Sequence, residues 1–210
     1  MFIGIIFLCL YIFARNIVSF LSAEKNINAK VIIIEGYIED YAYPEIIDKI
    51  GQIQPDLIIT TGTSFDQGFY LSGIPSAAHL IAYSLYELGV DSSIIHIVPV
   101  NPDVSINRTY NTALVSKKYL LLRYPEVKSI NLLSTSVHSR RSYYLFRMVF
   151  EPDIAVGNIV ITSKFLTENN WYKSSRAFRV VISETIAWCY NWLFFSPDIE
   201  KDINKVIIPH

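Results

Sequence analysis

The sequence predicts an α/β protein, a three-layer sandwich with a mainly parallel five-stranded sheet between helices, preceded by an N-terminal hydrophobic helix. Two observations carry this prediction. Short β-branched runs alternate along the chain with segments of helical spacing, and the runs are apolar at nearly every position, as in strands covered on both faces. With 210 residues, 51% of them apolar and 18% charged, the chain can bury one sizeable core.

Each predicted strand is a short apolar run that ends at a turn-forming or polar residue. The five runs cover residues 31–34, 56–60, 94–98, 129–133 and 154–161. Gly36 follows the first run, Gly62 the second and Pro99 the third, whereas the fourth gives way to the hydroxyls of Ser134 and Thr135. Strands that alternate with helices in this way are joined by right-handed crossovers, which favours a parallel sheet.

The predicted helices are recognised by apolar spacing and by terminal signals. They cover residues 44–53, 75–88, 109–123, 139–150 and 174–195. In the first helix Ile46, Ile50 and Ile53 recur at helical spacing. Gly89 stands where the end of the second helix favours positive φ, and Pro152 stops the fourth.

The N-terminus carries an apolar run of 13 residues, 2–14, which resumes at 17–21 after Arg15 and Asn16. A helix that spans a bilayer needs about 20 mostly apolar residues, so this segment is predicted to be a single-pass membrane anchor with Arg15 reaching the interface. A cleaved signal peptide and a buried core helix are the alternatives. We therefore expect an anchor at 1–22, a linker at 23–30, an α/β domain at 31–196 and a polar tail at 197–210.

Composition and motifs exclude several classes of function. The net charge of −1 gives no basic field for nucleic acid. No pair of histidines has ligand spacing, and the two cysteines are far apart, so no metal site is expected. The chain also lacks the dinucleotide, P-loop and nucleophile-elbow patterns.

Ligands of parallel sheets bind beyond the carboxyl ends of the strands, so the residues that follow each strand are the candidates. Hydroxyls, glycines and arginines gather there, and such groups form sites for phosphate or carboxylate. The candidate ligand-binding residues are Gly36, Thr61, Gly62, Thr63, Arg108, Thr109, Ser136, Arg140 and Arg141.

The stretch after the fourth strand, "TSVHSRRSYYLF" at 135–146, is the most informative of these. Two adjacent arginines at a helix start oppose the helix dipole, which makes sense mainly if an anion or a carboxylate lies opposite them. His138 is the candidate general acid or base, and Glu35 would hold a hydroxyl or orient His138. The alternative is a solvated first turn of a surface helix, in which the hydroxyls are ordinary caps.

A further carboxylate, Glu184, lies within the apolar C-terminal helix, where it requires a partner. Arg179 and Arg108 are the candidates, and we expect a structural ion pair.

Seven segments in this order resemble the YdcF/SanA/ElyC-type family, over about residues 31–195. They are "IIIEGYIEDYAYPE", "ITTGTSFDQGFYLSG", "LYELGVD", "NRTYNTA", "HSRRSYYLF", "VGNIVI" and "WYKSSRAFRVVISETIAWCY". The resemblance implies a Rossmann-like domain behind a membrane helix, and an envelope-related role. By this resemblance, the motif residues of the family correspond to Glu35, Gly36, Thr61, Gly62, Arg108, Thr109, His138, Arg140, Arg141 and Glu184. One departure is that Thr63 stands where relatives commonly have a second glycine.

Two functions of different classes follow. In the first, a membrane-anchored domain binds a phosphorylated or nucleotide-like small molecule, with or without catalysis. In the second, the chain is a membrane-tethered scaffold or regulator whose polar cluster is structural. The basic residues Arg15, near the end of the anchor, and Lys25 and Lys30, after it, favour a cytoplasmic domain by the positive-inside rule. The family resemblance favours an extracytoplasmic one.

Overall fold

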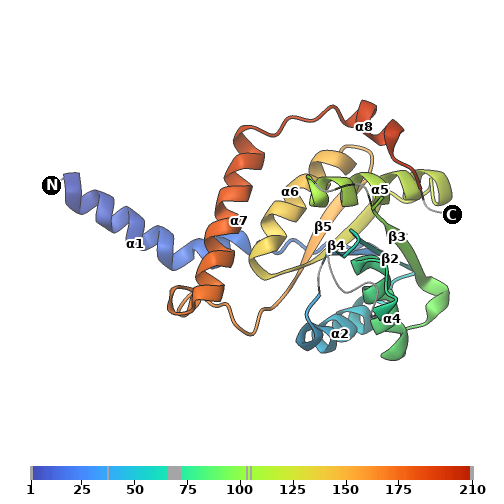
Figure 1. Ribbon diagram of the computed structural model, residues 1–210, viewed down its shortest axis with the longest axis horizontal. Coiled ribbons are helices and arrows are strands. Elements are labelled where there is room, and N and C mark those ends of the chain that lie inside the picture. Colours follow the sequence, from blue (N-terminus) through green and yellow to red (C-terminus); the bar gives the residue numbers. More distant parts are fainter. Residues whose placement is uncertain (1, 37, 66–71, 103, 105, 209–210) are drawn as a thin grey trace.

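The computed structural model in Figure 1 describes residues 2–36, 38–65, 72–102, 104 and 106–208. In the first helix it describes side chains from Tyr11 onward.

Five parallel strands form one sheet in the order β3-β2-β1-β4-β5. The strands are β1 (Val31–Glu35), β2 (Leu57–Gly62), β3 (Ile95–Pro99), β4 (Ser129–Thr135) and β5 (Ala155–Ile161). In the register of the central strands, Ile33 of β1 faces Ile59 of β2 on one side and Leu132 of β4 on the other. The predicted α/β class with a five-stranded parallel sheet is thus confirmed.

The five helices that the sequence predicts after the first strand begin and end close to the predicted positions. The helices of the structure are α1 (Phe2–Leu21), α2 (Tyr43–Ile53), α4 (Ala77–Glu87), α5 (Arg108–Arg123), α6 (Ser139–Phe150), α7 (Ser175–Leu193) and α8 (Ile199–Lys205). Short 3-10 turns are η1 (Asp40–Ala42), η2 (Ser92–Ile94), η3 (Ser136–His138) and η4 (Trp171–Lys173). The α4 helix starts later than the sequence predicts because Ser76 caps it, its Oγ accepting from the backbone N–H of His79.

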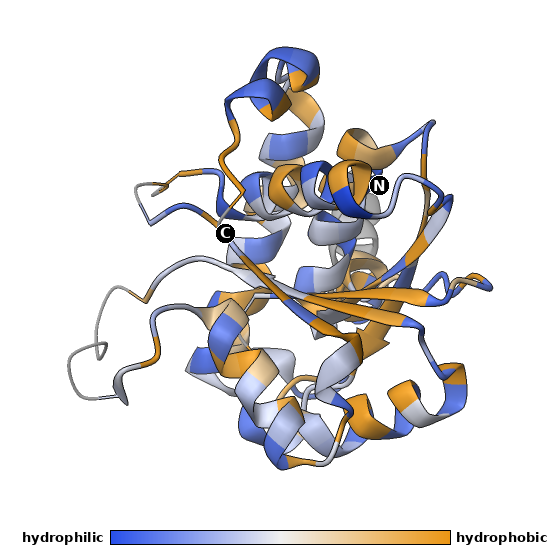
Figure 2. Cartoon of the chain, turned by 90° about the vertical axis from the view of Figure 1, so that its right-hand side faces the viewer, coloured by the Kyte–Doolittle hydropathy of each residue, from blue (hydrophilic) through white to orange (hydrophobic). Residues whose placement is uncertain are grey.

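Helices cover both faces of the sheet, and the strands form the apolar layer between them (Figure 2). Successive side chains of a strand point to opposite faces. Ile32 and Ile34 of β1 therefore pack with α2 and α4, whereas Ile33 packs with α5 and α6. Phe146 and Phe150 of α6 are fully buried in the second of these cores, with their rings stacked at 5.7 Å.

The C-terminal part of α1 belongs to the domain. Ile17, Val18 and Leu21 are buried in a third apolar cluster with Val181 of α7 and Trp171 of η4. The N-terminal part extends away from the sheet (Figure 1). Among the described residues, no helix combines the length and apolar character that crossing a membrane requires. The membrane anchor at 1–22 stays a prediction, since many of its side chains lie outside the described set.

The segment predicted as a linker, 23–30, is fixed to the sheet. The backbone of Lys25 exchanges hydrogen bonds of 2.9 and 2.7 Å with Asn158 of β5. The side-chain amide of Asn131 on β4 bonds both the N–H and the C=O of Ile27, at 3.1 and 2.8 Å. Two buried asparagines therefore hold the connection between α1 and the first strand.

The segment predicted as a polar tail contains α8, which packs on α5. Ile199, Ile203 and Val206 are partly buried against the α5 side of the core. The hydroxyl of Tyr110 donates to Asp202 at 3.1 Å. Apolar residues at 199, 203 and 206 are spaced as on one face of a helix, but the segment is too short for this pattern to stand out.

Candidate functional site

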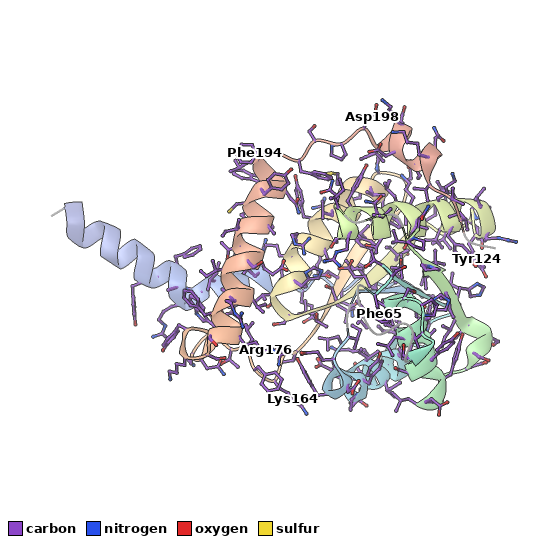
Figure 3. The ribbon with its side chains drawn as sticks, viewed as in Figure 1. Phe65, Tyr124, Lys164, Arg176, Phe194 and Asp198 are labelled. Atoms are coloured by element: carbon purple, nitrogen blue, oxygen red, sulfur yellow. The ribbon has the colours of Figure 1, made fainter. Side chains whose placement is uncertain are left out.

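The candidate site lies where the strand order reverses. The chain builds β2 and β3 on one side of β1, and β4 and β5 on the other, so the crevice between β1 and β4 is the topological switch point at which ligands of such sheets bind. A pocket of about 670 Å³ opens there. It is lined by Glu35, Gly36, Thr63, Ser64, Phe65, Ala77, Arg108, Thr109, Thr135, His138, Arg141 and Glu184. Phe65 is labelled in Figure 3, near the middle of the molecule.

Glu35 forms the floor of the pocket at the end of β1. It is 4% exposed. Its Oε2 accepts from the hydroxyl of Thr112 and its Oε1 from that of Ser134, each at 3.4 Å. Because a buried carboxylate requires polar partners, these two hydroxyls hold Glu35 in place. The side chain of His138 approaches from above, with Nε2 3.5 Å from Oε1 of Glu35.

His138 lies between two carboxylates. Its Nδ1 is 3.1 Å from Oε1 of Glu184 and 3.0 Å from Nη2 of Arg141. Nδ1 cannot donate to one and accept from the other at once, since it holds at most one proton. The ring nitrogen therefore either donates to Glu184 or accepts from Arg141, which also reaches the same Oε1 of Glu184 at 3.3 Å. The other ring nitrogen, Nε2, faces Glu35.

Arg141 and Glu184 form a two-point salt bridge. Nε of Arg141 donates to Oε2 of Glu184 at 2.8 Å, and Nη2 donates to Oε1 at 3.3 Å. Burial alone would raise the pKa of Glu184, but the hydrogen bonds and charges of His138 and Arg141 outweigh it and lower the pKa to about 2. The structural ion pair predicted for Glu184 is present, but its partner is Arg141. Arg179 instead donates to the carbonyl of Ser175.

The first turn of α5 supplies the opposite wall. Oγ1 of Thr109 accepts from Nη1 of Arg141 at 3.2 Å, and the exposed Arg108 lines the pocket beside it. The hydrogen bonds to Glu184 and Thr109, together with the contact of Nη2 with Nδ1 of His138, engage at most four of the five N–H groups of Arg141. The guanidinium therefore keeps at least one donor that a ligand can use while it is held by protein partners.

The loops after β1 and β2 contribute Gly36 and Thr63 to the pocket. Gly36 has φ +76°, which a glycine adopts without strain, and its N–H donates to the carbonyl of Thr61 at 3.1 Å. Two residues that were predicted to bind a ligand are not among those that line the pocket. Thr61 is a buried residue of β2, and a Cβ on Gly62 would lie 2.8 Å from that of Ala77, so this glycine serves the close packing of β2 on α4.

Arg140 and Ser136 also lie elsewhere than predicted. Nε of Arg140 donates to the carbonyl of Phe20, and its guanidinium stacks on that ring at 4.0 Å from the centroid. Burial lowers the pKa of Arg140. The predicted ligand contact by Arg140 is therefore replaced by a contact with α1. Ser136, at φ +43°, lines a neighbouring pocket of about 350 Å³ on the other side of His138.

Sequence reasoning missed Thr112, which helps to hold Glu35. Its hydroxyl also donates to the carbonyl of Thr109 at 2.7 Å. A threonine on the buried face of α5, one turn after Thr109, is the signal that could have identified it. Phe65 also lines the pocket, and the sequence offers no chemical reason to single it out, whereas Thr135, which lines it as well, belongs to the stretch after the fourth strand that the sequence indicates.

The arrangement suits an anionic ligand that also carries hydroxyl groups. Arg108 and Arg141 can bind an anion, while Glu35 can accept from a ligand hydroxyl that reaches the floor. A proton could pass through His138, which connects Glu35 to Glu184. Because hydroxyl donors and arginines surround both carboxylates, the pocket favours an anion over a metal ion.

Comparisons with family models, curated proteins and solved structures find no significant match for this chain.

Proposed function

We propose that this chain is a YdcF-like, membrane-anchored α/β domain that binds a phosphorylated or nucleotide-like small molecule in the pocket at the carboxyl edge of the sheet. One observation carries the proposal. Arg108, Arg141, His138 and Glu35 come from four different elements and line one pocket at the switch point. The volume of about 670 Å³ lies within the usual range of small-molecule sites, roughly 300–1,000 Å³.

In this proposal the phosphate binds between Arg108 and a remaining N–H group of Arg141, near the backbone of Gly36 and Thr63. A sugar or other hydroxyl reaches Glu35. His138 donates a proton to the ligand or accepts one from it, and Glu184 orients the ring. A role in the cell envelope and an extracytoplasmic domain are proposed by resemblance to the family.

The test is thermal stabilisation of the full chain by inorganic phosphate, ADP and glucose 6-phosphate. A ligand that binds only the folded state at 100 times its Kd stabilises it by about 2.7 kcal/mol. We expect Arg108→Gln and His138→Asn to reduce the stabilisation at a fixed ligand concentration. Arg123→Gln is the matched control, because Arg123 is an exposed arginine at the other end of the same helix. No stabilisation by any of the three probes would contradict the proposal.

A second candidate function, a membrane-tethered scaffold, is favoured by a separate observation. Arg141 is matched by the internal carboxylate of Glu184, and Arg140 contacts α1. In that case the cluster locks α7 and α1 onto α6, and the phosphate probes leave the melting temperature of the wild type and of Arg108→Gln equally unchanged.

A further inference from the structure

The outer face of α7 is an apolar surface within the described structure. Five large side chains recur at spacings of four, four, four and three residues, as on one face of a helix. They are Phe178, Ile182, Ile186, Tyr190 and Leu193, with exposed fractions of 46, 38, 64, 51 and 58%. Trp192 and Phe194 beside the end of this stripe are 61 and 73% exposed. Contiguous exposed patches of this kind mark interaction sites.

The opposite face of α7 is the one that packs on the domain. Ala177 and Val181 are buried against α1, and Glu184 is directed to Arg141 and His138. The α7 helix thus carries two apolar stripes, one that packs in the core and another that faces away from it. The inner stripe accounts for the folding of α7, and the outer stripe needs a separate explanation.

The position of α1 indicates what covers this surface. The α1 helix passes α7 and continues away from the sheet, on the side of α7 opposite to the strands (Figure 1). Phe20 of α1 contacts Trp188 of α7, with ring centroids 5.0 Å apart. Tyr11, Ile12 and Phe13 are 59, 52 and 52% exposed. Both helices therefore expose large apolar side chains on the part of the molecule where α1 leaves α7.

We propose that the outer face of α7 lies on a lipid bilayer, with its apolar side chains at the level of the headgroups and the start of the acyl chains. Interfacial helices bury apolar residues to this depth, and tryptophan and tyrosine are enriched there. Lys173, just before α7, and Arg179, in its second turn, suit contact with anionic headgroups. The inference rests on the membrane association proposed above and adds a second, peripheral contact to the predicted anchor.

This contact would fix the orientation of the site. Glu184 extends from the inner face of the same helix whose outer face would meet lipid, and it holds both Arg141 and His138. A bilayer on α7 would therefore hold the pocket at a constant height above the membrane.

The test uses the full chain in phosphatidylcholine vesicles, with and without phosphatidylglycerol, and follows tryptophan quenching by brominated lipid. We expect quenching in the wild type and a reduction of it in Trp192→Phe, because Trp192 is exposed, whereas Trp171 is 7% exposed and Trp188, which stacks on Trp192 at 6.1 Å, is half-buried. Ile186→Glu should likewise reduce the quenching of Trp192. Leu122→Glu is the matched control, since Leu122 is 62% exposed against 64% for Ile186. Its neighbour Tyr124 lies at the opposite side of the molecule (Figure 3).

Flotation of the vesicles distinguishes membrane association of the whole chain from the contact of α7 with lipid. A chain that does not float with vesicles refutes membrane association as a whole. A chain that floats, but whose Trp192 is quenched by aqueous iodide and not by brominated lipid, refutes the α7 contact alone. A dimer in detergent that Ile186→Glu converts to a monomer would also overturn it, since a second copy would then cover this face.

Discussion

Glu184 of α7 and Arg141 of α6 are joined by two hydrogen bonds, Nε to Oε2 at 2.8 Å and Nη2 to Oε1 at 3.3 Å. The two residues are 43 positions apart in the chain. Their side chains are 16 and 18% exposed. The pair attaches the C-terminal helix to the helix after β4 and at the same time positions a guanidinium in the pocket.

Glu184→Gln should destabilise the fold. It leaves Arg141 buried without a matching charge, and removing one member of a buried pair costs roughly 3–5 kcal/mol. Since this pair keeps some exposure, we expect about 3 kcal/mol in urea denaturation. Glu87→Gln at the exposed end of α4 is the control. An equal loss in both variants would show that the pair contributes nothing specific.

The same pair predicts a pH dependence. The pKa of Glu184 falls from 4.5 to about 2 on folding, because His138 and Arg141 outweigh the effect of burial. A carboxylate whose pKa is lowered on folding contributes stability that is complete above the unfolded pKa and is lost as the pH falls through the folded pKa. The wild type should lose on the order of 3 kcal/mol from this group between pH 5 and 2. In Glu184→Gln the free energy of unfolding should depend less steeply on pH in that range. Identical slopes in the two proteins would contradict the assignment of this pH dependence to Glu184.

The sheet was predictable because its strands are buried on both faces, so that runs such as Val31–Ile34 are apolar without interruption. The pocket was predictable because a parallel sheet gathers all its strand ends at one edge. Side-chain direction was not predictable. Arg140 and Arg141 are adjacent in sequence, yet one contacts Phe20 and the other Glu184, since neighbouring residues of a helix point about 100° apart.

The same reason explains the partner of Glu184. Sequence reasoning named Arg179 and Arg108 as candidates, but Arg179 donates to the backbone of Ser175. The contact with Arg141 depends on how α7 packs on α6, which is a tertiary relationship. Gly62 is a similar case, because a glycine after a strand can serve either a ligand or close packing, and only the distance to Ala77 distinguishes them.

Arg140→Gln should loosen α1 without weakening phosphate binding. The substitution removes the hydrogen bond to the carbonyl of Phe20 and the stacking on its ring. We expect faster hydrogen exchange in the residues around Leu21 and a change of Kd for inorganic phosphate below about twofold, since rim charges act weakly at a distance. A tenfold increase in this Kd would show that Arg140 contributes to phosphate binding, as the sequence predicts.

Gly62→Ala should destabilise the fold although alanine is a small residue. Its Cβ would lie 2.8 Å from Cβ of Ala77 and 3.3 Å from the backbone nitrogen of Ala78. Overpacking of this kind costs about 1–3 kcal/mol. Gly51→Ala is the matched control, because a Cβ there meets nothing within 4 Å, and it should stabilise α2 by about 0.5–1 kcal/mol. We expect the two substitutions to change the melting temperature in opposite directions. Stabilisation by both would refute the packing role of Gly62.

Ile203→Ser tests whether α8 is an integral part of the fold. Ile203 is partly buried against the core that contains Tyr110. Full burial of an isoleucine stabilises by about 1.5–3 kcal/mol, so its partial burial predicts a loss of about 1 kcal/mol in urea denaturation. The hydrogen bond of Tyr110 to Asp202, at 3.1 Å, should weaken with it.

Ile207→Ser is the control for this prediction, because Ile207 belongs to the same tail and is 69% exposed. It should change the free energy of unfolding by less than about 0.5 kcal/mol, as surface substitutions usually do. If both variants behave alike, the contacts of α8 add nothing to stability, and the segment is the solvated tail that its composition suggests. A larger loss for Ile203→Ser would instead make α8 the last element of the α/β domain.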